Sequence, residues 1–120
     1  MTMLAQVVVA LVAVLHLYFL ALEMFLWTSP AGRRAFGTTP EFAEASRVLA
    51  ANQGLYNGFL AAGLIWGLSL GGTGHAVVTF FLVCVAIAGV YGALTVSRKI
   101  LFVQAVPALI GLTLMYLSRS

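Results

Sequence analysis

The sequence predicts an all-α, polytopic membrane protein that folds as an antiparallel four-helix transmembrane bundle. Of its 120 residues, 62% are hydrophobic and only 8% are charged, whereas a soluble domain carries about 25% charged residues. The apolar residues lie in stretches long enough to cross a bilayer, and short polar or glycine-rich segments separate these stretches. A chain of this composition cannot cover a water-facing surface, so we expect the lipid bilayer to be its environment.

The first expected helix covers residues 3–27 and is apolar over most of its length, which is enough to span a membrane. Trp27 stands at its end, where an aromatic side chain anchors a helix at the membrane interface. The stretch has no basic start and no small-x-small cleavage site, so we interpret it as a helix of the mature protein rather than a signal peptide.

The second expected helix covers residues 40–70 and starts within the largest polar segment, residues 28–45. Thr39 is expected to cap this helix, with Pro40 at the first helical position and acids in the first turn. The helix would begin on the water side and continue past Arg47 into the membrane.

The third and fourth expected helices cover residues 75–96 and 101–117. The glycine turn GGTG precedes the third helix, and the basic turn SRK separates the third from the fourth. Such short connections make neighbouring helices antiparallel, so we expect a single domain over residues 1–120. Pro107 interrupts the backbone bonding of the fourth helix and is expected to kink it.

The distribution of basic residues predicts the orientation. The loops after the first and third helices lie on one side of a four-span protein, and that side carries Arg33, Arg34, Arg47, Arg98 and Lys99. The other side has only Arg119. By the positive-inside rule, we expect a bacterial inner-membrane protein with both termini outside and the first and third loops in the cytoplasm.

Polar side chains gather in the first half of the second helix. Asn52 and Tyr56 share one face by their four-residue spacing, and Gln53 and Asn57 form a second stripe beside it. Unpaired polar groups are costly in hydrocarbon, so these side chains either hold helices together or line a pocket. The sequence leaves both interpretations open.

The other helices also place their polar residues at the cytoplasmic end, while the opposite halves are almost purely apolar apart from His16. Polar groups needed only to join helices would not all have to lie at one end. We therefore predict a polar chamber at cytoplasmic depth. Its candidate ligand-binding residues are Glu23, Arg47, Asn52, Gln53, Tyr56, Tyr91, Arg98 and Gln104.

Glu23 is the acid expected within the hydrocarbon or at its edge, which makes it a candidate functional residue. Arg47 lies near the same depth and is the expected cationic partner. A structural Glu23–Arg47 ion pair and a role in ligand or proton handling are both compatible with the sequence. His16 lies seven residues earlier on the same helical face, deeper in the membrane, and is interpreted as an interhelical hydrogen-bonding residue rather than as a base.

Several classes of function lack the residues they need. The single cysteine, Cys84, excludes an internal disulfide and a cysteine metal cluster. Two histidines at opposite depths do not make a metal site, and the few scattered basic residues do not indicate nucleic-acid binding.

The sequence also contains two small-xxx-small patterns, at residues 54–58 and 63–67, which allow close helix approach. With the apolar helix faces, these patterns predict a homo-oligomer.

Four segments carry a resemblance to a known family: HLYFLALEMFLW at residues 16–27, ANQGLYNGFLAAGL at 51–64, AGVYGA at 88–93 and QAVPA at 104–108. The chain resembles a family of small bacterial four-helix membrane proteins catalogued as a domain of unknown function. The resemblance covers nearly the whole chain. It implies a four-helix inner-membrane protein and implies no activity.

A more distant likeness involves the second helix. The chain is similar to the membrane-associated proteins of eicosanoid and glutathione metabolism, trimeric four-helix proteins that hold glutathione between subunits. Arg47 and Asn52 would match an arginine and an asparagine of that family, although their spacing is one residue longer. Tyr56 or Leu55 stands where the family has a glutamate, which departs from its pattern. The later residues with counterparts in that family are Tyr91, Arg98 and Gln104.

Three functions are compatible with these observations. The first is a membrane protein that forms a homo-oligomer and binds a lipophilic or small amphiphilic ligand in the polar chamber. The second, implied by the distant likeness, is a glutathione-dependent transferase or isomerase in which Arg47 and Asn52 bind a carboxylate and Tyr91 or Arg98 stabilises a thiolate. The third is a small oligomeric transporter. The sequence does not decide whether the protein is an enzyme.

Overall fold

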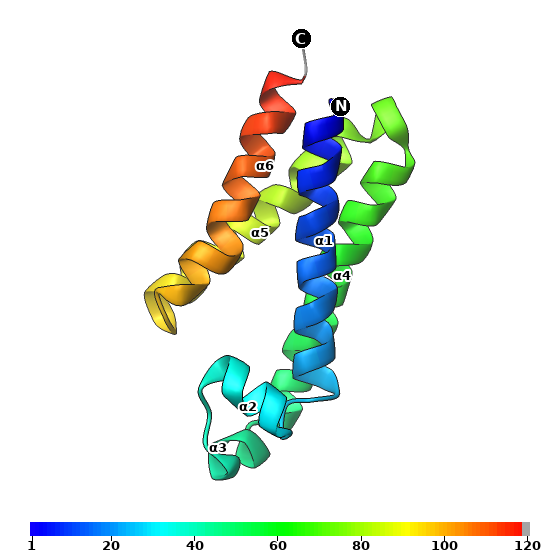
Figure 1. Cartoon of the computed structure of the whole chain (residues 1–120). Coiled ribbons are helices and arrows are strands. Elements are labelled where there is room, and N and C mark those ends of the chain that lie inside the picture. Colours follow the sequence, from blue (N-terminus) through cyan, green and yellow to red (C-terminus); the bar gives the residue numbers. More distant parts are fainter. Residues whose placement is uncertain (119–120) are drawn as a thin grey trace. The chain divides into compact units, whose positions relative to one another are not determined.

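The computed structural model describes residues 1–118, and this part of the chain contains helices and no strand. The long helices are α1, α4, α5 and α6, with short helical segments between them (Figure 1). The all-α fold class is therefore confirmed. The elements in order are α1 (Met3–Met24), α2 (Pro30–Phe36), α3 (Pro40–Ala45), α4 (Arg47–Ser69), η1 (Gly71–Gly74), α5 (His75–Thr95), η2 (Leu101–Ala105) and α6 (Val106–Leu117).

The chain forms two compact units. The small unit is Leu15–Phe59, and the large unit combines Met1–Val14 with Leu60–Ser120. Helices α1 and α4 each contribute one half to each unit. The expectation of one domain over the whole chain stays a prediction.

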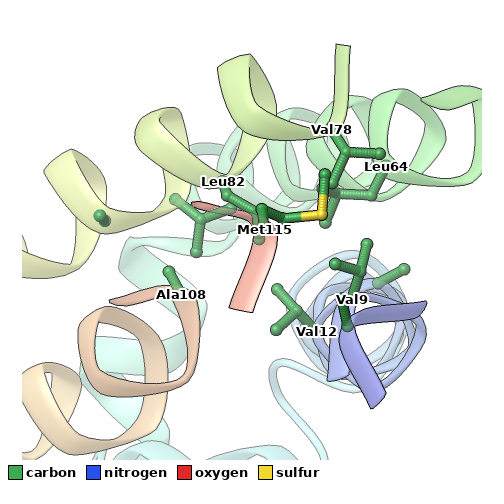
Figure 2. Close-up of a cluster of buried hydrophobic side chains, with 11 residues drawn as sticks. Val9, Val12, Leu64, Val78, Leu82, Ala108 and Met115 are labelled. Carbon is green, nitrogen blue, oxygen red and sulfur yellow. The ribbon is translucent and has the colours of Figure 1, made fainter. Parts of the chain in front are cut away.

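The large unit has an apolar core to which four helices contribute (Figure 2). Val9 and Val12 come from α1, Leu64 from α4, and Leu82 from α5, and all four side chains are buried. Each buried aliphatic side chain of this size contributes roughly 1.5–3 kcal/mol where water is the alternative environment. Inside a bilayer, tight packing replaces this driving force. The remaining buried members of the core are Ala5, Ala13, Val78, Val85, Ala86, Ala108 and Met115.

Small residues bring the helices of the large unit close together. A Cβ atom at Gly67 would lie 2.6 Å from Val78 Cγ2 of α5, and one at Gly63 would overlap the ring of Phe81. A Cβ atom at Gly89 would lie 2.6 Å from the backbone nitrogen of Ala105. The pattern at residues 63–67 therefore serves α4–α5 packing within the chain, as small-xxx-small patterns do in membrane bundles.

The fourth expected helix differs from a regular α-helix at its start. Residues Leu101–Ala105 form one turn of π-helix, η2, and α6 begins at Val106 with Pro107 in its first turn. Proline removes a backbone donor and favours the first turn of a helix. The predicted irregularity at Pro107 thus takes the form of a π-helical turn that ends where the proline begins a new helix.

In the small unit, two helix boundaries differ from those expected from the sequence. Helix α1 ends at Met24 rather than at Trp27, and the second expected helix is divided into α3 and α4. The predicted cap is confirmed, since Thr39 Oγ1 accepts a hydrogen bond from the Phe42 amide at 3.1 Å. The division falls at Ser46, whose backbone leaves the helical region and whose hydroxyl donates to the Phe42 carbonyl at 2.7 Å. Such a side-chain bond competes with regular helix geometry.

The indole of Trp27 contacts two parts of the segment between α1 and α4. Its Nε1 donates to Ser46 Oγ at 3.1 Å, and its ring packs on Phe36 of α2 with ring centroids 4.9 Å apart. Ser29 caps α2, its side chain accepting from the Gly32 amide at 3.2 Å. The polar segment between the first and second long helices is therefore an ordered pair of short helices.

Two helical segments of the described chain are long and apolar enough to cross a membrane, Met3–Met24 and Gly71–Thr95, and the shorter Leu101–Leu117 is also apolar. Helix α4 is not among these segments, because the polar residues in its first half lower its mean hydropathy. The expected four spans and their orientation are therefore not established by length and composition. Arg119, the basic residue expected on the side opposite the first and third loops, lies outside the described residues.

Candidate functional site

The small unit holds a buried carboxyl group on α1. The side chain of Glu23 is 2% exposed. Gln53 Nε2 donates to one of its oxygens at 2.6 Å, and Asn57 Nδ2 donates to the other at 2.5 Å. Both donors come from α4, so the carboxylate–amide cluster joins α1 to α4 through residues that are 30 and 34 positions apart in the sequence.

The helical repeat and two glycines position this cluster. Gln53 and Asn57 lie four residues apart and therefore on one face of α4. Gly54 and Gly58 flank them and let α1 approach, since a Cβ atom at Gly54 would lie 3.1 Å from Glu23 Cβ and one at Gly58 would lie 2.6 Å from Leu20 Cδ1. The pattern at residues 54–58 therefore packs against α1 of the same chain.

The electrostatic partner of Glu23 differs from the predicted one. Arg47 lies on the exposed surface and its Nε is 3.4 Å from Glu44 Oε1, three residues earlier. Within residues 1–118, Glu23 makes no ion pair. The predicted Glu23–Arg47 pair is therefore wrong, because a carboxylate on the preceding turn is a nearer partner for the arginine. Neutral amides satisfy the hydrogen bonding of Glu23 but do not balance a negative charge.

His16 is fully buried, and its ring meets that of Phe19 edge-on with centroids 5.3 Å apart. This agrees with an interior position for the histidine. Whether it also bonds to another helix, as the sequence suggested, stays a prediction.

Two further candidates on α4 face outward. Asn52 and Tyr56 are exposed, and Tyr56 packs on Phe59 with ring centroids 6.1 Å apart. Gln53 is exposed too, although its amide group reaches Glu23. Of the candidates on α4, Gln53 thus contacts the buried carboxyl group, while Asn52 and Tyr56 lie on the surface beside it.

The remaining candidates belong to the large unit. Tyr91 near the end of α5 is 69% exposed, Arg98 is exposed in the following turn, and Gln104 is half-buried in η2. The predicted chamber combines these residues with Glu23 of the small unit. That combination stays a prediction, whereas the contacts of Glu23 are properties of the small unit itself.

Asn57 belongs to the site but was not among the sequence-based candidates. Its pairing with Gln53 at four-residue spacing was visible in the sequence as a second polar stripe. The stripe that faces Glu23 is this second one, and not the stripe formed by Asn52 and Tyr56. A single sequence does not fix the rotation of α4 about its axis, so the choice between adjacent stripes required the structure.

The fold and the site together define an all-helical chain with at least two strongly apolar helices and a buried carboxyl group held by two amides. The chain belongs to the family described as "Protein of unknown function (DUF1304)", which matches residues 10–116 and thus includes the whole site. This confirms the resemblance to a family catalogued as a domain of unknown function.

One relative documents the extent of this similarity. The "Uncharacterized protein YpaA" of Lactococcus lactis subsp. lactis (strain IL1403) is 33% identical over 114 residues, which cover 93% of this chain and 96% of the relative. No solved structure matches the chain.

Proposed function

We propose that the protein is a multi-pass inner-membrane protein that binds a small amphiphile, with the polar head of the ligand at the Glu23–Gln53–Asn57 cluster. The observation that carries this proposal is the buried carboxyl group of Glu23, whose two oxygens meet two amide donors from another helix. An ionisable side chain within an apolar helix is expensive to place there and is a functional-site candidate by default.

The surface of the long helices supports the membrane environment. Large apolar side chains are exposed along α1, α4, α5 and α6, where a soluble protein would carry charged residues. Examples with at least half of their surface exposed are Leu11, Tyr18, Trp66, Phe80, Ile87, Ile110 and Tyr116. Lipid tails are the environment in which such faces are stable.

Helix α4 fits a third span despite its polar residues. Two of these residues, Gln53 and Asn57, direct their amide groups to Glu23 rather than to lipid. Composition alone counts them as unfavourable, whereas paired polar groups are tolerated inside bundles. With α6 as the fourth span, both termini would lie outside and the first and third loops in the cytoplasm, in accord with the basic residues there.

The same contacts do not favour the glutathione-dependent alternative. Arg47, which would bind a carboxylate of glutathione, is paired with Glu44 on the surface. An ionised Glu23 would repel an anionic ligand at the interior site. We therefore propose ligand binding without assigning an enzymatic reaction.

Mass spectrometry of small molecules that co-purify with the full chain tests this proposal. The variant is Glu23→Gln, which keeps the size of the side chain and removes its charge. The matched control is Glu44→Gln, which changes the same residue type at an exposed position. We expect an amphiphile that is depleted in Glu23→Gln and retained in Glu44→Gln. The same set of bound molecules in all three proteins would refute the proposal and leave the cluster as a helix-joining contact.

A further inference from the structure

We propose that the Glu23–Gln53–Asn57 cluster binds the head group of a lipophilic ammonium ion, with Gln53 as the side chain that moves to admit it. This inference rests on the proposed function, because it names the chemical class of the amphiphile.

Two basic side chains of the small unit have their partners outside the cluster. Arg47 pairs with Glu44, and Arg33 Nε donates to the Thr28 carbonyl at 3.3 Å. Within the described residues, Glu23 has neutral donors alone. A cationic ligand is the species that complements an ionised, buried carboxylate, and the attraction between opposite charges grows as the effective dielectric constant falls.

The hydrogen-bonding groups of the cluster suit an ammonium ion. A carboxylate accepts several hydrogen bonds, and each amide carries a carbonyl oxygen besides its NH₂ group. Glu23, Gln53 and Asn57 therefore contribute four side-chain oxygens that an ammonium group with three donors can use. The amides donate to Glu23 in the structure, and rotation of the amide groups would present their carbonyl oxygens to a cation.

Exposure of the three side chains indicates the route of entry. Glu23 is 2% exposed and Asn57 is 9% exposed, whereas Gln53 is exposed although it bonds to Glu23. Gln53 therefore covers one carboxylate oxygen from the outside. Rotation of this long, flexible side chain uncovers that oxygen without any movement of the helices.

Apolar and aromatic groups lie beside this route. Tyr56 follows Gln53 by three residues and is 61% exposed, and its ring lies next to the exposed ring of Phe59. Residues three apart are neighbours on a helix surface. Aromatic faces attract cations in the range of about 0.5–2 kcal/mol, and they also favour an alkyl tail. The cluster and its surface thus match a ligand with a cationic head and an apolar tail.

Binding of three probes with the same tail tests this inference. The probes are decylammonium, decanol and decanoate, titrated by calorimetry into the full chain in phosphatidylcholine nanodiscs, with empty nanodiscs as the reference. We expect decylammonium to bind about tenfold more tightly than decanol, with decanoate weakest. This ratio corresponds to about 1.4 kcal/mol. Glu23→Gln should remove the preference for decylammonium, and Glu44→Gln should keep it.

The outcomes separate this inference from the proposed function. Equal binding of decanol and decylammonium to the wild-type protein would leave amphiphile binding intact and overturn the ammonium assignment. Failure of all three probes to bind the folded wild-type protein would overturn both.

Gln53→Ala keeps the carboxylate and removes the covering side chain, so decylammonium should associate faster with this variant. An unchanged association rate would contradict the role given to Gln53. Circular dichroism and size-exclusion chromatography confirm that each variant is folded.

Discussion

Replacing Asn57 by leucine should destabilise the protein far more than the same replacement at Asn52. Asn57 is 9% exposed and donates to Glu23, whereas Asn52 is exposed on the same helix. A hydrogen bond to a charged group contributes about 1.5–3 kcal/mol in soluble proteins, and interhelical bonds inside bilayers average about 0.6 kcal/mol. These values bracket an expected loss of roughly 1–2 kcal/mol for Asn57→Leu. For Asn52→Leu, a surface change, we expect an effect within about 0.5 kcal/mol.

The free energy of unfolding, measured by denaturant titration in detergent micelles with helical circular dichroism as the signal, provides the test. A double-mutant cycle with Glu23→Gln isolates the contact, and we expect a coupling energy of about 1 kcal/mol between residues 23 and 57. Equal losses for Asn57→Leu and Asn52→Leu, or a coupling energy near zero, would refute the assignment of Asn57 as a partner of the buried carboxyl group.

Three further predictions concern the rest of the chain. Gly89→Ala should destabilise the large unit by roughly 1–3 kcal/mol, because the new methyl group would lie 2.6 Å from the backbone of Ala105; Gly72→Ala, where nothing lies within 4 Å, is the control, and similar losses would contradict the close contact. Ser46→Ala removes the acceptor for the Trp27 indole, so tryptophan emission should change and stability should fall by about 0.5–1.5 kcal/mol; unchanged emission and stability would argue against this bond. A single cysteine placed between the first two long helices, in a cysteine-free background, should react with an impermeant thiol reagent in inverted vesicles and remain unlabelled in right-side-out ones; the reverse result would overturn the proposed orientation.

Local sequence rules predicted the helix starts better than the helix ends. Thr39 and Pro40 marked the start of α3 correctly, since a capping side chain and a proline act through neighbouring residues. The end of α1 at Met24 and the break at Ser46 were missed. The break lies at the residue that accepts a hydrogen bond from the indole of Trp27, nineteen residues earlier. Hydrophobicity does not reveal a contact of this kind.

The candidate site was partly predictable for the same reason. Glu23 was identified because a lone acid in an apolar helix is conspicuous in any sequence. Its partner was assigned incorrectly to Arg47, because charge and approximate depth were the available criteria. The actual partners depend on how α4 is rotated toward α1. Gly54 follows Gln53 and Gly58 follows Asn57, and the close contacts of these glycines with α1 favour that rotation.

The glycine pairs of α4 also bear on the predicted homo-oligomer. Gly54 and Gly58 pack against α1 in the small unit, and Gly63 and Gly67 pack against α5 in the large unit. Both small-residue faces are thus filled within one chain, and a second copy would have to use the exposed large apolar side chains instead. We therefore expect Gly63→Leu to impair folding, because any Cβ atom there overlaps the ring of Phe81. Circular dichroism and crosslinking in membranes would test this, and a variant that keeps its fold but loses only its oligomeric state would show that the face of Gly63 belongs to the interface between copies.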